Sequence, residues 1–221
     1  MYLIGNLFVE VWGDYALFTR PEMKVERVSY DVIKPAAARG ILEAIYWHPG
    51  LKYEIDRIFV MNKIIFENIR RNEVSQKISA RNVKDFMTNQ KGEIYLATSE
   101  NISQRAAMVL KNVRYVIEAH MIMTKGANSS DSLGKFYDIF IRRLENGQCY
   151  GTPCLGVREF PANFRLYKKN CIKTAYENET RDLGFMLYDM DYSDKENICP
   201  MFFRAVMENG VINVKNPEVF K

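Results

Sequence analysis

The stretch VIKPAAARGILEAIYWHPG (residues 32–50), which follows LFVEVWGDYALFTRP (residues 7–21), predicts a strand, a loop and a helix in that order. Leu7, Val9 and Val11 alternate with residues of the opposite face, as is typical of a strand with one buried side. Gly13-Asp14 breaks this alternation. We therefore expect the strand to end there and an aromatic loop to run over residues 15–21.

The second part of the stretch has start and stop signals typical of a helix. Pro35 suits a first-turn position, and Asp31 is a candidate N-cap just upstream. Apolar residues recur at helical spacing from Ala37 to His48, and Pro49-Gly50 is a stop signal. We expect a helix over residues 34–48.

Composition is that of an ordinary globular chain. The 221 residues are 48% hydrophobic, enough for one large or two small domains. The beginning, MYLIGNLFVEVWGD, lacks a basic segment and reaches Glu10 early, and no apolar run is long enough to span a membrane. We therefore expect a cytoplasmic protein with no membrane contact. The net charge of +4 permits a nucleic acid partner without requiring one.

The middle of the chain alternates between apolar and polar character. Residues 51–66 predict a long strand or hairpin whose apolar phase shifts at Asp56-Arg57, which indicates a bulge. Residues 67–93 are polar and cannot bury much, so we expect a mobile insertion or a poorly formed hairpin. A strand is expected to resume at residues 94–97.

The clearest strand signal covers residues 106–124. Its two faces divide the odd-numbered residues from 113 to 121 from the even-numbered ones, which places His120 on the face of Glu118 and Arg114. A second amphipathic helix is expected from Leu133 to Leu144, capped by Ser130 or Asp131 and ended at Gly147.

Beyond Gly147 the pattern predicts mostly strands. Short apolar alternations cover residues 154–160, 164–168, 184–191, 201–207 and 211–214, and Glu208-Asn209-Gly210 is a hairpin turn signal. The whole order resembles an α+β, ferredoxin-like (RRM-like) β-α-β-β-α-β domain with a C-terminal antiparallel β extension. We place the domain at residues 1–150, with the polar insertion near 67–93, and the extension at 151–221.

Several chemistries are poorly supported by the residues. The four cysteines form no C-x-x-C pair, no D-x-D or H-x-x-x-H pattern is present, and there is no P-loop, G-x-G-x-x-G or G-x-S-x-G motif. We therefore expect no metal site and no cofactor. Metal-free RNA cleavage remains, because the ribose 2′-OH supplies the nucleophile and the protein needs only to move protons and stabilise charge.

The chain has two histidines for such proton transfer, His48 and His120. Each also has a structural interpretation: His120 as a half-buried strand residue bonded to Glu118 or to a backbone group, and His48 as a helix terminator. Tyr46 can likewise be an amphipathic helix-end tyrosine. The aromatic residues Trp12, Tyr15 and Phe18 either stack on bases beside Arg20 or plug the end of the sheet.

Five segments in the same order carry a family resemblance: WGDYALFTRP (12–21), SYDVIKPAAARGILEAIYWHP (29–49), SQRAAMVLKNVRYVIEAH (103–120), PCLGVREFPA (153–162) and FRAVMENGVI (203–212). Together they resemble the CRISPR-associated repeat-processing endoribonuclease of type I-C (Dvulg subtype) systems, in the RAMP superfamily. The resemblance implies metal-independent cleavage of the precursor CRISPR RNA at the repeat hairpin. It also implies that the mature guide RNA is retained in a Cascade-type complex with a backbone RAMP subunit and a large subunit.

The resemblance implies catalytic roles for Tyr46 in IYWHP and His120 in YVIEAH. The lysine expected beside the histidine is not matched, since Glu118 and Ala119 stand there; Lys125 and Arg114 are the nearest cations in sequence, and Lys125 completes the predicted catalytic set. His120 is expected to act as general acid or base and Tyr46 to orient the ribose or phosphate. The predicted RNA-binding residues are Arg20, Arg39, Arg105, Arg114 and Arg158.

Two other functions stay open at the level of sequence. The absent lysine motivates a non-catalytic subunit that binds the 5′ handle of a guide RNA cut by another enzyme. A DNA nuclease is a third possibility, and a requirement for added divalent metal would distinguish it.

Overall fold

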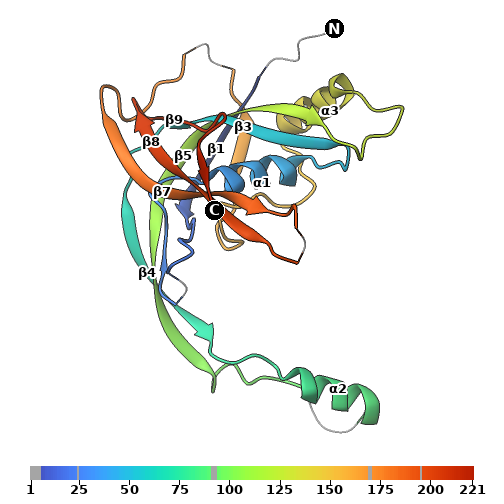
Figure 1. The fold of residues 1–221 in the computed structure, drawn as a ribbon. Coiled ribbons are helices and arrows are strands. Elements are labelled where there is room, and N and C mark those ends of the chain that lie inside the picture. The colour runs from blue at the N-terminus through green and yellow to red at the C-terminus, as the bar shows by residue number, and fades with distance from the viewer. Residues whose placement is uncertain (1–5, 24, 91–93, 169–170, 195) are drawn as a thin grey trace.

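The computed structural model describes residues 6–23, 25–90, 94–168, 171–194 and 196–221. Along these residues the elements are β1 (Leu7–Ala16), β2 (Arg27–Val28), α1 (Pro35–Ile45), β3 (Leu51–Val60), β4 (Phe66–Val74), α2 (Ala80–Asn89), β5 (Ile102–Met123), α3 (Leu133–Asn146), β6 (Asn163–Leu166), β7 (Thr180–Asp191), β8 (Cys199–Glu208), β9 (Val211–Asn213) and β10 (Val219–Phe220). The fold is a mixed α/β structure dominated by an antiparallel sheet with few helices (Figure 1).

Strand β5 organises the sheet. It pairs antiparallel with β1 and with β3, and β6 pairs antiparallel with β1, which gives the local order β3-β5-β1-β6. Helix α1 follows β1 and helix α3 follows β5. The residues of β5 that the sequence placed on one face, from Val113 to Met121, pack in the core with the buried sides of both helices. The helices therefore cover one face of the sheet and leave polar residues on the other.

The helix predictions are confirmed, with corrections at their ends. Helix α1 begins at Pro35 and ends at Ile45, and Lys34 rather than Asp31 occupies the N-cap position, without a side-chain hydrogen bond. Ser132 caps α3 by accepting from the backbone of Lys135, so neither Ser130 nor Asp131 has that role. These differences are one to three residues along the chain and fall at the helix ends, which are the least sharply defined parts of a helix.

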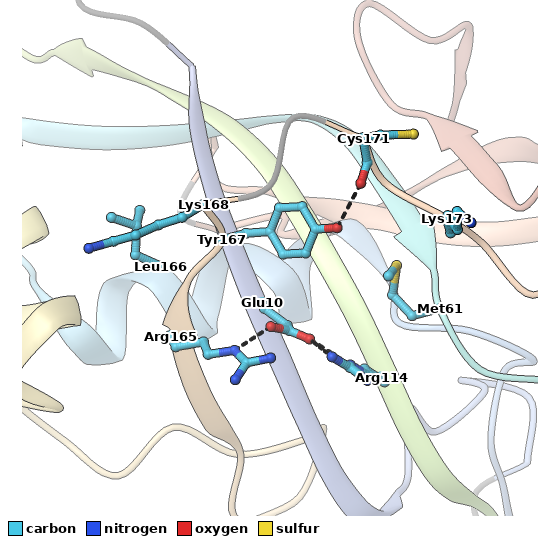
Figure 2. Close-up of a pocket in the computed structure, with 9 residues that line it drawn as sticks. All are labelled: Glu10, Met61, Arg114, Arg165, Leu166, Tyr167, Lys168, Cys171 and Lys173. Atoms are coloured by element: carbon cyan, nitrogen blue, oxygen red, sulfur yellow. Dashed lines mark hydrogen bonds and ion pairs between the residues drawn. The ribbon is translucent and has the colours of Figure 1, made fainter.

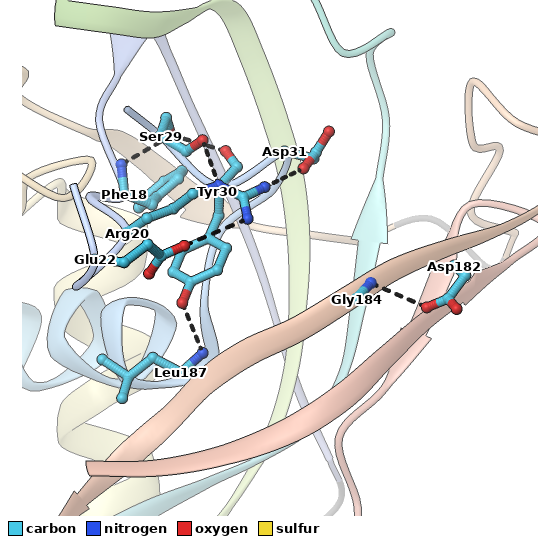
Figure 3. A network of polar contacts seen from close by, with 9 residues as sticks. All are labelled: Phe18, Arg20, Glu22, Ser29, Tyr30, Asp31, Asp182, Gly184 and Leu187. Carbon is cyan, nitrogen blue, oxygen red and sulfur yellow. Dashed lines mark hydrogen bonds and ion pairs between the residues drawn. The ribbon is translucent and has the colours of Figure 1, made fainter. Parts of the chain in front are cut away.

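The side chain of Asp31 accepts a hydrogen bond from Arg20 at 2.9 Å instead of capping α1 (Figure 3). Arg20 also lies over the ring of Tyr30, with 4.7 Å between the guanidinium carbon and the ring centroid. The Tyr30 hydroxyl accepts from the backbone of Leu187 on β7 at 3.3 Å. This network ties the loop after β1 to the C-terminal hairpin.

Two strand predictions meet different outcomes. The bulge in β3 is confirmed, because the register against β5 shifts between Ile55 and Arg57. The predicted end of the first strand at Gly13-Asp14 is wrong, since β1 continues to Ala16 in register with β5. A Cβ at Gly13 would lie 2.6 Å from a methyl carbon of Leu155. Glycine at this position therefore leaves room for the Leu155 side chain, and it does not end the strand.

The polar segment is more regular than the sequence indicated. Strand β4 pairs with residues 102–110 of β5 along its whole length, and α2 follows it at the tip, so a long arm extends away from the body (Figure 1). Backbone pairing with β5 makes residues 66–74 a regular strand although they bury little, so the prediction of a poorly formed hairpin is wrong for this part, whereas the mobility of the segment stays a prediction. Residues 94–97 form no strand, against prediction, and residues 91–93 of the predicted segment lie outside the described part.

The C-terminal third is mostly β, as predicted. Strands β7, β8 and β9 form an antiparallel set that joins the main sheet through β9 and β3. Asn209 and Gly210 both have positive φ (52° and 75°) and make the predicted hairpin turn. The alternation at residues 154–160 yields only an isolated bridge between Cys154 and Pro161, so that predicted strand is absent from the described residues.

The division into residues 1–150 and 151–221 stays a prediction. Residues from both parts share one sheet, since β6 pairs with β1 and β9 with β3. Helix α1 is linked to β7 through the ion pair between Arg39 and Asp189. In the part of the chain that the structure describes, no helix is long and apolar enough to cross a membrane.

Candidate active site

Tyr46 ends α1 on the helix-covered face of the sheet. Only 7% of the residue is exposed, its ring lies 6.3 Å from that of Phe136 on α3, and the Arg143 guanidinium lies over it at 5.0 Å. Arg143 also donates to the backbone oxygen of Ile45 at 2.7 Å. Burial raises the pKa of the Tyr46 phenol above its usual value, so the hydroxyl stays protonated at neutral pH.

His48 is the histidine close to Tyr46. Its ring lies 4.8 Å from that of Phe136, and its Nδ1 accepts a hydrogen bond from the Gly50 backbone at 3.0 Å. An accepting Nδ1 places the hydrogen of the neutral imidazole on Nε2, which faces the Asp131 carboxylate at 3.8 Å. This arrangement agrees with the structural interpretation of His48 as part of the helix terminus.

Lys125 is exposed in the turn that follows β5. That turn is joined to the loop after α1, since the Thr124 hydroxyl donates to the backbone oxygen of Pro49 at 2.6 Å. A Cβ on Gly126 would also lie 2.6 Å from that oxygen. Lys125 therefore lies on a loop adjacent to the His48 loop and not beside His120.

His120 belongs to a different environment. Its Nδ1 lies 2.8 Å from the Oδ2 of Asp56, a buried residue of the β3 bulge, and its Nε2 lies 3.4 Å from the Oε2 of the half-exposed Glu54. The histidine side chain itself is 34% exposed. His120 is a half-buried strand residue, as the structural interpretation expected, but its partner is Asp56 and not Glu118, which binds Arg57 and Asn6.

Tyr46 and His120, the two residues with implied catalytic roles, lie on opposite faces of the sheet. His120 lies between Ala119 and Met121, which both face the core beneath the helices, so its side chain points to the opposite face of β5. Tyr46 lies on the helix side, where its backbone oxygen accepts from the Tyr53 hydroxyl at 2.8 Å. The structure therefore separates the two residues by the thickness of the sheet, and their catalytic roles stay predictions.

Arg57 is a cation that sequence reasoning did not select. Its Nε binds Glu118, which is two positions from His120 on the same face of β5, and the guanidinium lies 5.3 Å from the Phe59 ring centroid. Ion pairing with Glu118 raises the pKa of Arg57, and the nearby Asp56 adds to this effect. The only signal in the sequence was the predicted bulge, because a bulge re-aims the residues at Asp56-Arg57.

Two of the predicted RNA-binding arginines serve the fold. Arg20 binds Asp31 in the network of Figure 3, and Arg39 pairs with Asp189 to join α1 and β7. Both guanidiniums are largely buried by these contacts. Their contribution to RNA binding stays a prediction.

The other three predicted arginines lie apart from one another. Arg105 lies on the β5 strand of the arm, where its Nε lies 3.6 Å from Glu73. Arg158 is exposed in the loop before β6. Arg114 lies on the uncovered face of the sheet, in the same row as His120, and binds the buried carboxylate of Glu10. Of the five, the structure places Arg114 on the face that carries the His120 cluster.

A cavity of about 730 Å³ lies on this uncovered face, beside Glu10 (Figure 2). Arg114 of β5 and Arg165 of β6 both bind the Glu10 carboxylate from opposite sides. The cavity is lined by Glu10, Met61, Arg114, Arg165, Leu166, Tyr167, Lys168, Cys171 and Lys173. Burial alone would raise the pKa of Glu10, but the two guanidiniums outweigh it and hold that pKa below its ordinary value.

The uncovered face thus combines an acid–base group with cations. The Nδ1 of His120 is held by the buried Asp56, and its Nε2 faces the half-exposed Glu54 on the solvent side, so a substrate would reach Nε2 in place of Glu54. Arginines on the same face can bind phosphate oxygens through several N–H donors. Among the described residues, no group of three or more histidine, cysteine, aspartate or glutamate side chains is arranged to hold a metal ion.

Known proteins resemble this chain in sequence and in fold. A protein from Mannheimia succiniciproducens described as CRISPR pre-crRNA endoribonuclease Cas5d is 50% identical over 217 residues, covering 96% of each chain. The fold is similar to that of a crystal structure described as a CRISPR-associated protein (TM-score 0.72, 24% identity, 100% of this chain and 99% of that one). It is also similar to a chain of a CRISPR RNA-guided surveillance complex (TM-score 0.56, 12% identity, 96% and 91% covered).

The family assignment rests on nearly the whole chain. A family model described as CRISPR-associated protein (Cas5), of the Cas5d type, matches residues 6–215. This range includes the Glu10 carboxylate, the β3 bulge and His120. The chain therefore belongs to the Cas5d family of CRISPR-associated proteins.

Proposed function

We propose that this chain is an endoribonuclease that cleaves precursor CRISPR RNA in the repeat hairpin without a metal ion. The observation that carries the proposal is the His120 imidazole held by the buried Asp56 on a face that also presents Arg57. The Mannheimia relative, half of whose residues are identical, carries the name of that activity. Residues for proton transfer and charge stabilisation are sufficient, because the RNA supplies its own nucleophile.

The proposed reaction is an internal transfer. His120 takes the proton of the ribose 2′-OH, and the 2′-oxygen forms a bond to the adjacent phosphorus. The bond from phosphorus to the 5′-oxygen breaks, and that oxygen takes a proton from water. The products are a 2′,3′-cyclic phosphate and a 5′-OH. Arg57 stabilises the charge on the phosphorane, which is the role expected of Lys125 from sequence, and Asp56 is the positioning residue for the imidazole.

We infer that β3-β5-β1-β6, with α1 and α3, is a ferredoxin-like unit. The support is the order of elements along the chain, β1-α1-β3-β5-α3-β6, together with the antiparallel pairing of neighbouring strands. In this arrangement both helices lie on one face, and the other is open to RNA, as in RRM-type domains. The β7–β9 strands extend this unit.

We further propose that the protein acts in the cytoplasm and keeps the cleaved guide RNA within a Cascade-type complex that includes a backbone RAMP subunit and a large subunit. The fold likeness to a chain of a surveillance complex supports this assembly. Co-purification with tagged complex subunits and sequencing of the bound RNA would test it.

Cleavage of the cognate repeat hairpin in EDTA tests the activity. Wild type should yield a 2′,3′-cyclic phosphate, and a 2′-deoxy substitution at the scissile nucleotide should stop the reaction. His120→Ala should lower the single-turnover rate by about 10²–10⁴-fold, the usual contribution of a general acid or base. Asp56→Asn should lower it in the same direction and should change the pH–rate profile, since it alters the partner of the imidazole.

His48→Gln is the matched control, because His48 lies on the other face of the sheet. Tyr46→Phe tests the role implied by the family: a folded variant that has lost cleavage would show that the phenol acts, despite its burial. Loss of activity in His48→Gln but not in His120→Ala would move the acid–base group to the helix-covered face. Tight repeat binding without turnover by wild type would select the non-catalytic 5′-handle subunit.

A further inference from the structure

Glu10 holds two guanidiniums in fixed positions on the uncovered face. The residue is 1% exposed and pairs with both Arg114 and Arg165, and the Arg165 guanidinium also lies 5.2 Å from the Trp12 ring centroid. Arg165 binds Glu10 through its Nε, and within the part of the chain that the structure describes its two terminal amino groups make no hydrogen bond. Glu10 contributes one negative charge, and Arg114 and Arg165 contribute two positive charges. The cluster therefore keeps a net positive charge and free N–H donors for an anion.

The surroundings of this pair are basic and aromatic. Lys173 is exposed at the cavity of about 730 Å³, whereas Lys168 is engaged with Glu145 at 2.9 Å. Tyr167 extends across the cavity, and its hydroxyl donates to the backbone oxygen of Cys171 at 3.1 Å (Figure 2). The volume falls in the range of about 300–1,000 Å³ that suits a small-molecule-sized group such as a nucleotide.

A second cavity adjoins the arginine pair. It has a volume of about 330 Å³ and is lined by Glu10, Trp12, Asn62, Asn112, Val113, Arg114 and Arg165. The two cavities share Glu10 and both arginines. Fixed cations flanked by aromatic rings and amides fit an unpaired strand whose phosphate lies on the arginines and whose bases contact the rings. An A-form duplex offers no such splayed base.

We propose that the Glu10–Arg114–Arg165 cluster is a subsite for one phosphate of unpaired RNA, with an adjacent base in the cavity beside Tyr167. The proposal rests on the function proposed above and adds a second place, besides the His120 cluster, at which the protein contacts the RNA. Arg114 and His120 are six positions apart on β5, which corresponds to about 20 Å at the rise of a strand. The subsite therefore binds nucleotides outside the scissile bond. The sequence had already predicted Arg114 as an RNA-binding residue. The structure adds Glu10, Arg165 and Lys173 to the proposed subsite.

Fluorescence anisotropy with a labelled, unpaired uridine octamer tests the subsite over a series of salt concentrations. Arg165→Gln should raise the Kd about fivefold or more and reduce the magnitude of the salt slope by about 0.7, the value for one phosphate contact on a single strand. Lys173→Gln should act in the same direction. Arg204→Gln is the matched control, since Arg204 is an exposed arginine paired with Asp182 on the C-terminal hairpin.

The outcomes separate this subsite from the catalytic proposal. A weaker Kd in Arg165→Gln and an unchanged one in Arg204→Gln support the subsite. Equal affinities for wild type and Arg165→Gln, with matching melting curves, overturn it even where wild type cleaves the hairpin. Wild type that binds the octamer through Arg165 but does not cleave in EDTA overturns the catalytic proposal and leaves the subsite standing. Equal weakening in both arginine variants indicates general charge attraction and also overturns the subsite.

Discussion

At the scale of single residues, the cation near His120 is not the lysine that the family resemblance implied. The lysine expected beside the histidine is replaced by Glu118, and the structure pairs that carboxylate with Arg57 from the neighbouring strand. An arginine thus lies on the same face of the sheet as His120, although it comes from β3. The bulge at Asp56 makes this possible, because it offsets the two strands by one residue.

The acid–base assignment predicts different effects of the two histidines on cleavage. Burial keeps the Tyr46 phenol protonated at neutral pH, so it cannot supply a base there. At about pH 7, His120→Ala should therefore lose most of the cleavage rate, whereas His48→Gln should keep it. Equal rates for wild type and His120→Ala would contradict the assignment.

Glu10 gives a prediction for stability. Its folded-state pKa is lowered, so its contribution is full above the unfolded value near 4.5 and is lost as the pH falls through the folded value. Glu10→Gln should therefore be less stable than wild type at pH 7, and the difference should narrow below about pH 4.5. Urea unfolding of both proteins from pH 7 to pH 3 measures this. A constant difference over the whole range would show that the guanidiniums do not lower the pKa.

At the scale of elements, Gly40 in a helix has open space around it, whereas Gly210 in a hairpin turn is crowded. Substitution of each by alanine should therefore change stability in opposite directions. Gly40 is exposed on α1, and a Cβ there would meet nothing within 4 Å. Gly40→Ala should stabilise the protein by about 0.5–1 kcal/mol, since alanine is the better helix former. Thermal or urea unfolding measures the change, and a loss of stability would contradict the open environment.

Gly210→Ala should have the opposite effect. Gly210 has φ of 75° in the hairpin turn, and a Cβ there would lie 2.5 Å from the side chain of Thr174. We expect a loss of about 1–3 kcal/mol from the strained backbone and the contact. The same unfolding measurement checks it, with Gly40→Ala as the matched comparison. Equal stability would show that the turn can move away from Thr174.

At the scale of the whole molecule, the arm and the body differ in what stabilises them. Helix α2 has no buried residue, and β4 alternates only between exposed and half-buried positions. Replacing residues 76–100 by a short Asn-Gly turn should therefore leave the melting temperature within a few degrees of wild type, because little apolar area is lost. Calorimetry measures this. A large drop would mean that the tip stabilises the body.

The sequence by itself determined the two amphipathic helices, the long β5 strand, the bulge and the Asn209-Gly210 turn. Each of these depends on local periodicity or on backbone preferences of a few neighbouring residues. The arm was misjudged because its order comes from hydrogen bonds to β5, more than 30 residues away for most pairs, and not from its polar side chains. Gly13 was misjudged for a similar reason, since Leu155 lies against it.

Only the tertiary structure decided which candidate residues share a site. The sequence selected Tyr46 and His120 and placed His120 on the face of Glu118 and Arg114, but strand pairing and helix packing determine which face of the sheet each residue occupies. Tyr46 lies beneath the helices, and His120 lies with Asp56, Arg57 and the Glu10 cluster on the uncovered face. Residues far apart in the chain meet through strand register, and side-chain direction reverses with every residue of a strand. Local patterns therefore predict the elements, while the pairing of those elements decides the site.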